Sequence, residues 1–370
     1  MKIQFLNPNI TEEDIQQVAK VLRSGWLVLG KEAENFENNF SRYMGTKEAV
    51  ATNSCTSSLH KALLVAGVKP DDEIITTPLS YVSTSNAILH CGAVPVFVDV
   101  EPETGLIDVT KIEKAITSKT TAILPVHLYG QMADMKSIKK IAKKHRLVII
   151  EDAAHAIEAE RDGIRPGQAS TAACFSFHVA KNITAGQGGM LILNDNKKAE
   201  LARLLRRDGV ANIGSTRRMI VLGYKHLMTD FQAALLNNQL ARIDQQWKER
   251  VRLFNRYSSA FKDHANIKFP KTIPGVKHAC HMFIIWVDPK KRDLFRGKLD
   301  EFGIQTSIHY DPIHLEPFYK KKYGYKKDDF PIAEKLGTST ITLPLYPHLT
   351  RPEQEYVIKK VKEIGNTLNA

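Results

Sequence analysis

The chain has 370 residues, of which 43% are hydrophobic and 25% are charged, as is typical of a globular protein in water. Its net charge is +12, but the basic residues are spread along the whole chain, so we expect no nucleic-acid partner; an anionic small substrate is equally consistent with the charge. Apolar runs fall short of the ~20 residues that span a bilayer, so we expect no membrane segment. The four cysteines lack the spacing typical of metal ligands, so we expect no metal site.

The opening residues, MKIQFLNPNITEED, turn acidic too early for a signal peptide, so we expect a cytoplasmic location. The one dense basic run, Lys320 to Lys327, contains two tyrosines. We interpret it as a solvated loop rather than as a basic binding patch.

Short apolar runs alternate with amphipathic stretches over the first two thirds of the chain. Strands are predicted at 49–54, 73–77, 94–100, 121–126 and 147–152. Helices are predicted between them, over 58–67, 83–92, 108–116 and 134–145. This alternation, with nearly continuous apolar strands, predicts an α/β fold in which helices cover both faces of a mainly parallel central sheet.

The later part of the chain is predicted to add a smaller α+β domain. Ahead of it we expect a strand over 188–193, a helix over 197–207, an exposed loop over 208–219 and a long helix over 229–257. We place the boundary inside that helix, between a large domain of residues 1–245 and a small one of residues 246–370. The small domain is expected to contain strands at 281–287 and 303–310.

Small polar residues gather directly after the first predicted strand, where a helix begins among Asn53, Ser54, Cys55, Thr56 and Ser57. Ligands of an open parallel sheet bind beyond the carboxyl ends of its strands. The free backbone N–H groups of a helix N-terminus can hold a phosphate there. An ordinary Ser/Thr helix cap explains the same residues, so this pattern alone leaves both interpretations open.

Asp152 ends the predicted strand 147–152 at the same edge of the sheet. It could cap the next helix, or it could face a cationic ring nitrogen, with Glu151 on the opposite side of the strand. His155 follows three residues later and could lie over the same pocket, although an isolated histidine is more often structural.

Lys181 lies in the stretch SFHVAKNITAGQGGM, among small apolar residues and ahead of three glycines. A lysine in such surroundings should have a lowered pKa and be a usable amine nucleophile, able to form a Schiff base with a carbonyl. Pyridoxal phosphate (PLP) offers an aldehyde for a lysine, a ring nitrogen for an aspartate and a phosphate for a helix N-terminus. The sequence has candidates for all three partners.

Seven segments together resemble the DegT-type aminotransferases of PLP fold type I, which place an amino group on nucleotide-linked keto sugars. They are DDEIITTPLSYVSTSNAI, PVFVDV, LPVHLYGQMADM, IIEDAAHA, FSFHVAKNITAGQGG, GYKHLMTDFQAALLNNQL and IHYDPIHLEPFY. The likeness runs from about Pro8 to the LPLYPHLT stretch, nearly the whole chain. Within the group, FHVAKNIT and GYK are most similar to the UDP-4-amino-4-deoxy-L-arabinose aminotransferases.

The resemblance implies roles for individual residues. Lys181 is expected to form the Schiff base, and Asp152 to pair with the protonated ring nitrogen. The other implied cofactor contacts are Cys55, Thr56 and Ser176 at the phosphate, Tyr81 on the ring face and His155 near the phenolic oxygen. For Tyr81 and His155, packing in the core is the alternative. The sugar nucleotide is expected at the domain junction, near His178, His309, Tyr310 and His314.

Two positions depart from the family pattern. Lys225 stands where many members carry an asparagine that reaches the partner subunit's phosphate, and a lysine could do this as a cation. That contact implies a homodimer with shared active sites. Gln187 stands where many members carry glutamate, and the sequence assigns it no role.

The implied reaction is a ping-pong transfer of an amino group from L-glutamate to a nucleotide-linked keto sugar, in the biosynthesis of cell-surface glycans such as lipopolysaccharide or of secondary metabolites. A 4-keto hexose or pentose is favoured, and a 3-keto sugar is the alternative. A PLP-dependent sugar dehydratase is disfavoured because those relatives carry histidine in place of Lys181. A regulatory protein that binds PLP without catalysis is a further alternative.

Overall fold

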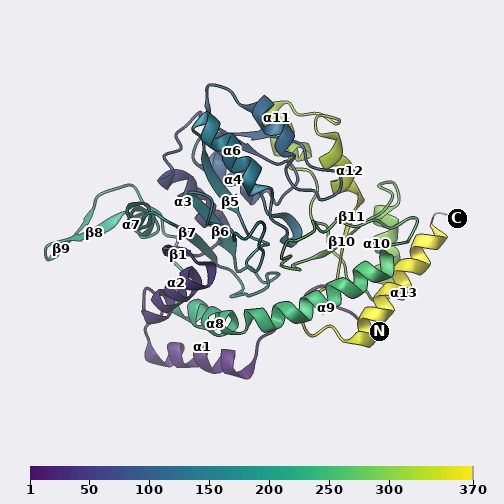
Figure 1. The fold of residues 1–370 in the computed structure, drawn as a ribbon. Helices are drawn as coiled ribbons and strands as arrows, with labels where there is room; N and C mark the ends of the chain where they lie inside the picture. The colour runs from purple at the N-terminus through teal and green to yellow at the C-terminus, as the bar shows by residue number, and fades with distance from the viewer. Residues whose placement is uncertain (369–370) are drawn as a thin grey trace.

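A seven-stranded sheet forms the centre of the larger part of the computed structural model, which describes residues 1–368 (Figure 1). The strand order is β1-β7-β6-β5-β4-β2-β3. The strands are β1 (Glu48–Thr52), β2 (Glu73–Thr76), β3 (Val94–Phe97), β4 (Thr120–Ile123), β5 (Val148–Asp152), β6 (Ala172–Ser176) and β7 (Gly189–Leu193). Neighbouring strands are parallel except that β7 runs antiparallel to both β1 and β6, so the mainly parallel sheet is confirmed.

Helices cover both faces of this sheet, as the apolar strands require. Alternate residues of β7 show this: Met190 and Ile192 pack into one hydrophobic cluster, and Leu191 and Leu193 into another. The first cluster includes residues of α2 (Lys31–Met44), α6 (Met135–His145) and α8 (Asp230–Ala241), and short α5 (Val109–Ile112) joins it. The second includes residues of α3 (Cys55–Val65), α4 (Ser83–His90) and α7 (Asn196–Leu205), whereas α1 (Glu12–Ser24) lies against α8.

The predicted long helix over 229–257 is two helices, α8 and α9 (Ile243–Phe261). Arg242 between them leaves helical geometry, with φ −112° and ψ 10°. Its guanidinium pairs with the fully buried carboxylate of Asp14, which ties the junction to α1. Helix α9 then runs into the smaller part of the molecule (Figure 1).

The smaller part pairs two antiparallel strands, β10 (Phe283–Trp286) and β11 (Thr340–Leu343), with helices α10 (Arg292–Glu301), α11 (Pro317–Tyr323), α12 (Pro331–Ser339) and α13 (Arg351–Thr367). The predicted strand 281–287 is confirmed over β10. The predicted strand 303–310 is wrong: that segment makes only isolated bridges, from Ile304 to Ile3 and from Ser307 to Thr342. The division at residue 245 stays a prediction.

The predicted exposed loop 208–219 is in fact a hydrogen-bonded hairpin, β8 (Val210–Ile213) and β9 (Thr216–Met219). Gly214 in the two-residue turn has φ 58°, a conformation that glycine adopts without strain and that tight hairpin turns need. The hairpin projects from the body of the molecule (Figure 1), and β9 is exposed along its whole length. The predicted exposure is therefore confirmed and the irregular conformation is not.

In the part of the chain that the structure describes, no helix combines the length and hydrophobicity that a membrane crossing requires. The basic run Lys320 to Lys327 begins inside α11 rather than in a loop.

Candidate active site

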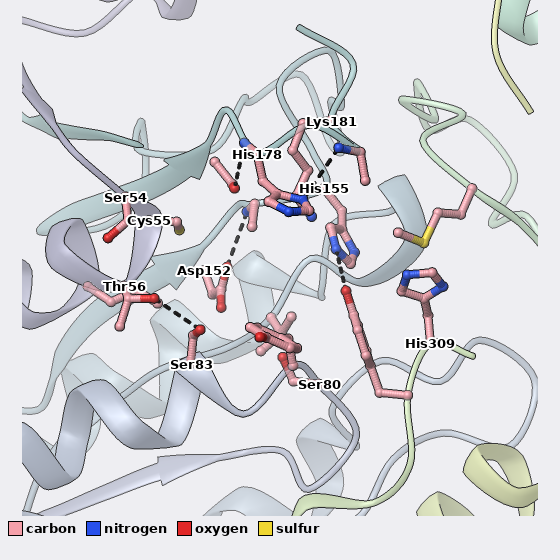
Figure 2. Close-up of a pocket in the computed structure, with 18 of the residues that line it drawn as sticks. Ser54, Cys55, Thr56, Ser80, Ser83, Asp152, His155, His178, Lys181 and His309 are labelled. Carbon is pink, nitrogen blue, oxygen red and sulfur yellow. Dashed lines mark hydrogen bonds between the residues drawn. The ribbon is translucent and has the colours of Figure 1, made fainter. Parts of the chain in front are cut away.

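A cavity of about 350 Å³ opens at the carboxyl edge of the sheet. Its walls come from the N-terminus of α3, the loop before α4, the end of β5, the loop between β6 and β7, and residues 309 and 310 of the smaller part (Figure 2). The sequence-predicted residues that line it are Cys55, Thr56, Tyr81, Asp152, His155, Ser176, His178, Lys181, His309 and Tyr310. Segments far apart in the sequence therefore converge where the parallel sheet predicts a ligand site.

The N-terminus of α3 forms one wall of the cavity. Ser54 caps the helix by accepting a hydrogen bond from the backbone N–H of Ser57. The first backbone N–H groups of a helix have no partner within it and carry its positive dipole end, which suits an anion. Gly189 lets β7 pack directly behind this turn, because a Cβ there would lie 2.4 Å from the backbone of Ser54. The predicted helix N-terminus is present, and its binding of a phosphate stays a prediction.

Asp152 ends β5 and points into the same cavity (Figure 2), with 5% of its surface exposed. Its carboxylate accepts hydrogen bonds from the hydroxyl of Thr84 at 2.7 Å and from the backbone N–H of Ala154 at 3.1 Å. Burial raises the pKa of Asp152 in spite of these bonds. A cationic group placed against this carboxyl would stabilise its ionised form.

Glu151 lies on the other face of β5, as predicted. Its side chain is fully buried and bonds to His127 at 2.6 Å and to the backbone N–H of Gly167 at 2.8 Å. The two adjacent carboxylates therefore have different surroundings, and only Asp152 faces the cavity.

Lys181 lies in the loop between β6 and β7 and is half-buried. Burial lowers its pKa from 10.5 to about 8, although nearby Cys55 and Asp152 act in the opposite direction. The prediction of an amine that is partly neutral near physiological pH is supported by this environment.

His155 is held in one tautomer by its two hydrogen bonds. Its Nδ1 accepts from the backbone N–H of Tyr129 at 3.3 Å, so Nε2 carries the proton and donates to the hydroxyl of Tyr310 at 3.1 Å. Burial holds the pKa of His155 well below its ordinary value, and burial likewise lowers that of His309 to about 3. These two imidazoles are therefore neutral. Lys181, in its protonated form, is a cationic group in the cavity wall.

The structure does not bring two of the predicted residues to this cavity. Lys225 is exposed and pairs with Asp208 at 2.6 Å, and it lies in the segment that follows the β8–β9 hairpin. His314 is fully buried and bonds to Glu334 at 2.9 Å, so we leave it out of the substrate site that we propose below.

Several cavity residues were missed at the level of sequence. They are Ser80, Ser83, Gln187 and Met282 in the wall, and Thr84 behind Asp152. The hydroxyl-rich stretch SYVST around Tyr81 is a sequence feature that could have indicated these residues. In the structure, Ser83 of this stretch accepts a hydrogen bond from Thr56 at 3.0 Å. Gln187, to which the sequence assigns no role, lines the cavity.

The residues present fit PLP. A helix N-terminus suits its phosphate, a buried carboxyl with a raised pKa suits its ring nitrogen, and an amine with a lowered pKa suits its aldehyde. All three border one cavity. Among the described residues, no cluster of histidine, cysteine and carboxylate side chains could hold a metal ion.

Comparisons with known proteins agree with this chemistry. The model of the DegT/DnrJ/EryC1/StrS aminotransferase family matches residues 8–362. The spore coat polysaccharide biosynthesis protein SpsC of Bacillus subtilis is 39% identical, over 96% of this chain and 95% of SpsC. GDP-perosamine synthase of Caulobacter vibrioides is 34% identical over 98% of each chain. The structure of Spr1654 from Streptococcus pneumoniae in its PMP form superposes with a TM-score of 0.96 at 30% identity, covering 100% of this chain and 98% of that one. The chain therefore belongs to the DegT/DnrJ/EryC1/StrS family, as a PLP-dependent sugar aminotransferase.

Proposed function

We propose that this protein transfers an amino group from L-glutamate to the keto group of a nucleotide-linked sugar, at C4 of a hexose or pentose. The observation that carries the proposal is the convergence of Lys181, Asp152 and the N-terminus of α3 on one cavity. The relatives named for GDP-perosamine and for spore coat polysaccharide support a nucleotide sugar and a glycan pathway. We place the reaction in the cytoplasm, in the biosynthesis of a surface glycan such as lipopolysaccharide or of a secondary metabolite.

The proposed roles follow from the positions of the side chains. Backbone N–H groups at Cys55 and Thr56, with the hydroxyl of Ser176, would hold the phosphate. Asp152 would keep the ring nitrogen protonated, and Tyr81, which is 59% exposed at the cavity, would cover the ring. PLP, when bound, supplies an electron sink and a temporary carrier for the amino group.

Lys181 would act as the acid–base group. A neutral amine with a pKa near 8 can take a proton from the α-carbon of the amino donor and return one at the sugar carbon. Burial raises the pKa of Asp152 and so favours its neutral form, and a protonated ring nitrogen opposite it would stabilise the ionised form. Lysine and aspartate thus have separate tasks.

The sugar would bind at the side of the cavity formed by the smaller part of the molecule. His309 and Tyr310 enter from that part, and His178 borders the cavity from the exposed side of the Lys181 loop. Their polar groups suit sugar hydroxyls and phosphate oxygens.

We further propose a homodimer in which each subunit completes the other's site. The β8–β9 hairpin and the segment that follows it expose apolar residues, with Met219 66% and Leu222 75% accessible. An isolated two-stranded hairpin is marginally stable in water, so it fits a surface that a second copy covers. Lys225 follows the hairpin and could bring its ammonium group to the phosphate held by the partner.

The test is a coupled assay of L-glutamate with UDP-, dTDP- and GDP-linked 4-keto and 3-keto sugars, in which 2-oxoglutarate and the amino sugar are both measured. We expect amino transfer to a 4-keto sugar and none with Lys181→Ala. Transfer only to a 3-keto sugar would correct the position, and no transfer to any sugar would support a regulatory protein instead. Borohydride trapping with PLP should label Lys181, and label at another lysine would contradict the site.

A further inference from the structure

A second, smaller cavity of about 40 Å³ borders Lys181. Its walls include the N-terminal segment Leu6 to Asn9, residues Gln246 and Arg250 of α9, and His281. Lys181 and Ala180 line both this cavity and the larger one, so the two cavities adjoin at the segment that carries the reactive lysine. The sequence alone assigns none of these wall residues a role.

Three buried nitrogen atoms on this wall lack a hydrogen-bond partner among the described residues. They are Nε of Arg250, Nε2 of Gln246 and Nε2 of His281. The three side chains are only 2%, 5% and 5% exposed. Buried polar groups in folded proteins are nearly always paired, and three such atoms at one small cavity indicate a polar occupant.

The hydrogen bonds around these atoms fix what each can offer. Arg250 uses one terminal nitrogen to bind the buried carboxylate of Glu158, and its Nε–H is left as a free donor. The amide nitrogen of Asn182 also donates to Glu158, at 2.8 and 3.0 Å, so the amide oxygen of Asn182 is an acceptor. That oxygen lies 3.0 Å from Nδ1 of His281, which must therefore carry the proton.

His281 is thus an Nδ1–H tautomer whose free Nε2 is an acceptor. Burial holds its pKa well below the ordinary value, so the ring is neutral. The side chains that line the cavity therefore carry two unpaired donors, on Arg250 and Gln246, and one unpaired acceptor, on His281. Two donors suit the oxygens of a carboxylate, and the acceptor suits an amino nitrogen beside it.

We propose that this cavity is the subsite for the α-carboxylate of the amino donor, bound by Nε of Arg250 and Nε2 of Gln246, with Nε2 of His281 accepting from the adjacent amino group. This cavity is far smaller than the larger one, so it would take the carboxylate group while the body of the amino acid stays in the larger cavity. An amino donor such as glutamate would reach this cavity with its α-carboxylate, which is a single carbon away from its amino group. This inference rests on the proposed function, in which an α-amino acid is the donor of the amino group.

The charges at the site are consistent with this occupant. Glu158 neutralises Arg250 and is itself satisfied by Asn182, so it does not compete for the free Nε–H. The ammonium form of Lys181, or of the amino donor, supplies the positive charge that balances the incoming carboxylate.

The test uses a pair of probes that differ only at the α-carboxylate. 2-Oxoglutarate has this group, and levulinate carries a methyl in its place; neither can turn over with the PLP-loaded protein in the absence of an amino donor. Titration calorimetry should show that wild-type protein prefers 2-oxoglutarate. Gln246→Leu and Arg250→Lys should reduce that preference about 10-fold or more, because each removes a donor to a charged oxygen.

Matched controls lie on the same helix. Gln245→Leu and Arg252→Lys make the same chemical changes at exposed positions and should keep the wild-type preference. Gln246→Leu leaves the Arg250–Glu158 pair intact, so it tests the inference even if Arg250→Lys fails to fold. An unchanged preference in Gln246→Leu, or no preference in wild-type protein, would mean that the cavity holds only water.

A kinetic measurement separates the two proposals. If wild-type protein takes no amino group from any amino acid, the proposed function fails. If wild-type protein uses L-glutamate and Gln246→Leu retains its KM for L-glutamate, only the subsite assignment fails. We expect the variant to raise that KM about 10-fold and to leave the KM for the sugar unchanged.

Discussion

The lowered pKa of Lys181 predicts how its reactivity depends on pH. Burial lowers the pKa from 10.5 to about 8. At pH 7 about a tenth of the amine is then neutral, against roughly 0.03% for an unperturbed lysine, a difference of about 300-fold. Because only the neutral amine attacks an aldehyde, the rate of PLP capture by cofactor-free protein should rise about 10-fold per pH unit up to pH 7 and level off above pH 8.

The assay follows absorbance as cofactor-free protein is mixed with PLP between pH 6 and 10. Rate constants are also compared with those of Nα-acetyl-lysine under the same conditions, and Lys181→Ala provides the background. The titration of PLP itself cancels in the ratio of the two rate constants, which should stay constant up to pH 7 and fall about 10-fold per pH unit above pH 8. Since the charge of Asp152 raises the pKa of Lys181, Asp152→Asn should move the midpoint to lower pH. If the rate constant for the protein still climbs between pH 9 and 10, as for a free lysine, the reasoning from burial is refuted.

Three further outcomes can be checked on single variants or mixtures. Thr84→Val removes the hydroxyl that donates to Asp152 at 2.7 Å and should weaken PLP binding about 5- to 10-fold in a spectroscopic titration; an unchanged affinity would show that this bond does not orient the carboxylate. Glu151→Ala leaves buried partners without their acceptor and should lower the free energy of unfolding in urea by about 3 kcal/mol, whereas a loss below ~1 kcal/mol would contradict the role of that network. Mixing inactive Lys181→Ala and Lys225→Ala proteins should restore up to about a quarter of wild-type activity if sites are shared, and no recovery would indicate that each subunit is self-sufficient.

The sheet was predictable because strands buried on both faces leave a strong local signal. Strand β6 was missed, since Ala172, Ala173 and Cys174 have weak strand propensity and become a strand only through burial between β5 and β7. The error at 303–310 has the opposite cause. Its alternating residues imitate a strand, but only Ile304 and Ser307 make ladder-type bridges, to Ile3 and Thr342. The local sequence pattern contains no information about such tertiary partners.

Site residues were predictable where one residue carries the chemistry. Lys181 and Asp152 stand out because an amine and a carboxylate are unusual beside buried strands. Thr84, Gln246 and Arg250 could not be found this way: each is an ordinary residue of a helix whose significance lies in what it faces in three dimensions. Arg250 was invisible in sequence because its partner, Glu158, lies 92 residues away in the chain.

The antiparallel orientation of β7 is what places Lys181 at the ligand edge. A parallel strand after β6 would require a crossover of a dozen or more residues that starts at the carboxyl edge and returns from the opposite one. Here residues 177–188 leave the carboxyl end of β6 and enter β7 at the same edge, so the whole loop stays over the cavity. Gly189 begins β7 opposite Thr52, the last residue of β1, which directly precedes the turn into α3. One reversed strand thus brings the amine to the cavity that the N-terminus of α3 and Asp152 also border, and a side chain at Gly189 would displace the turn into α3.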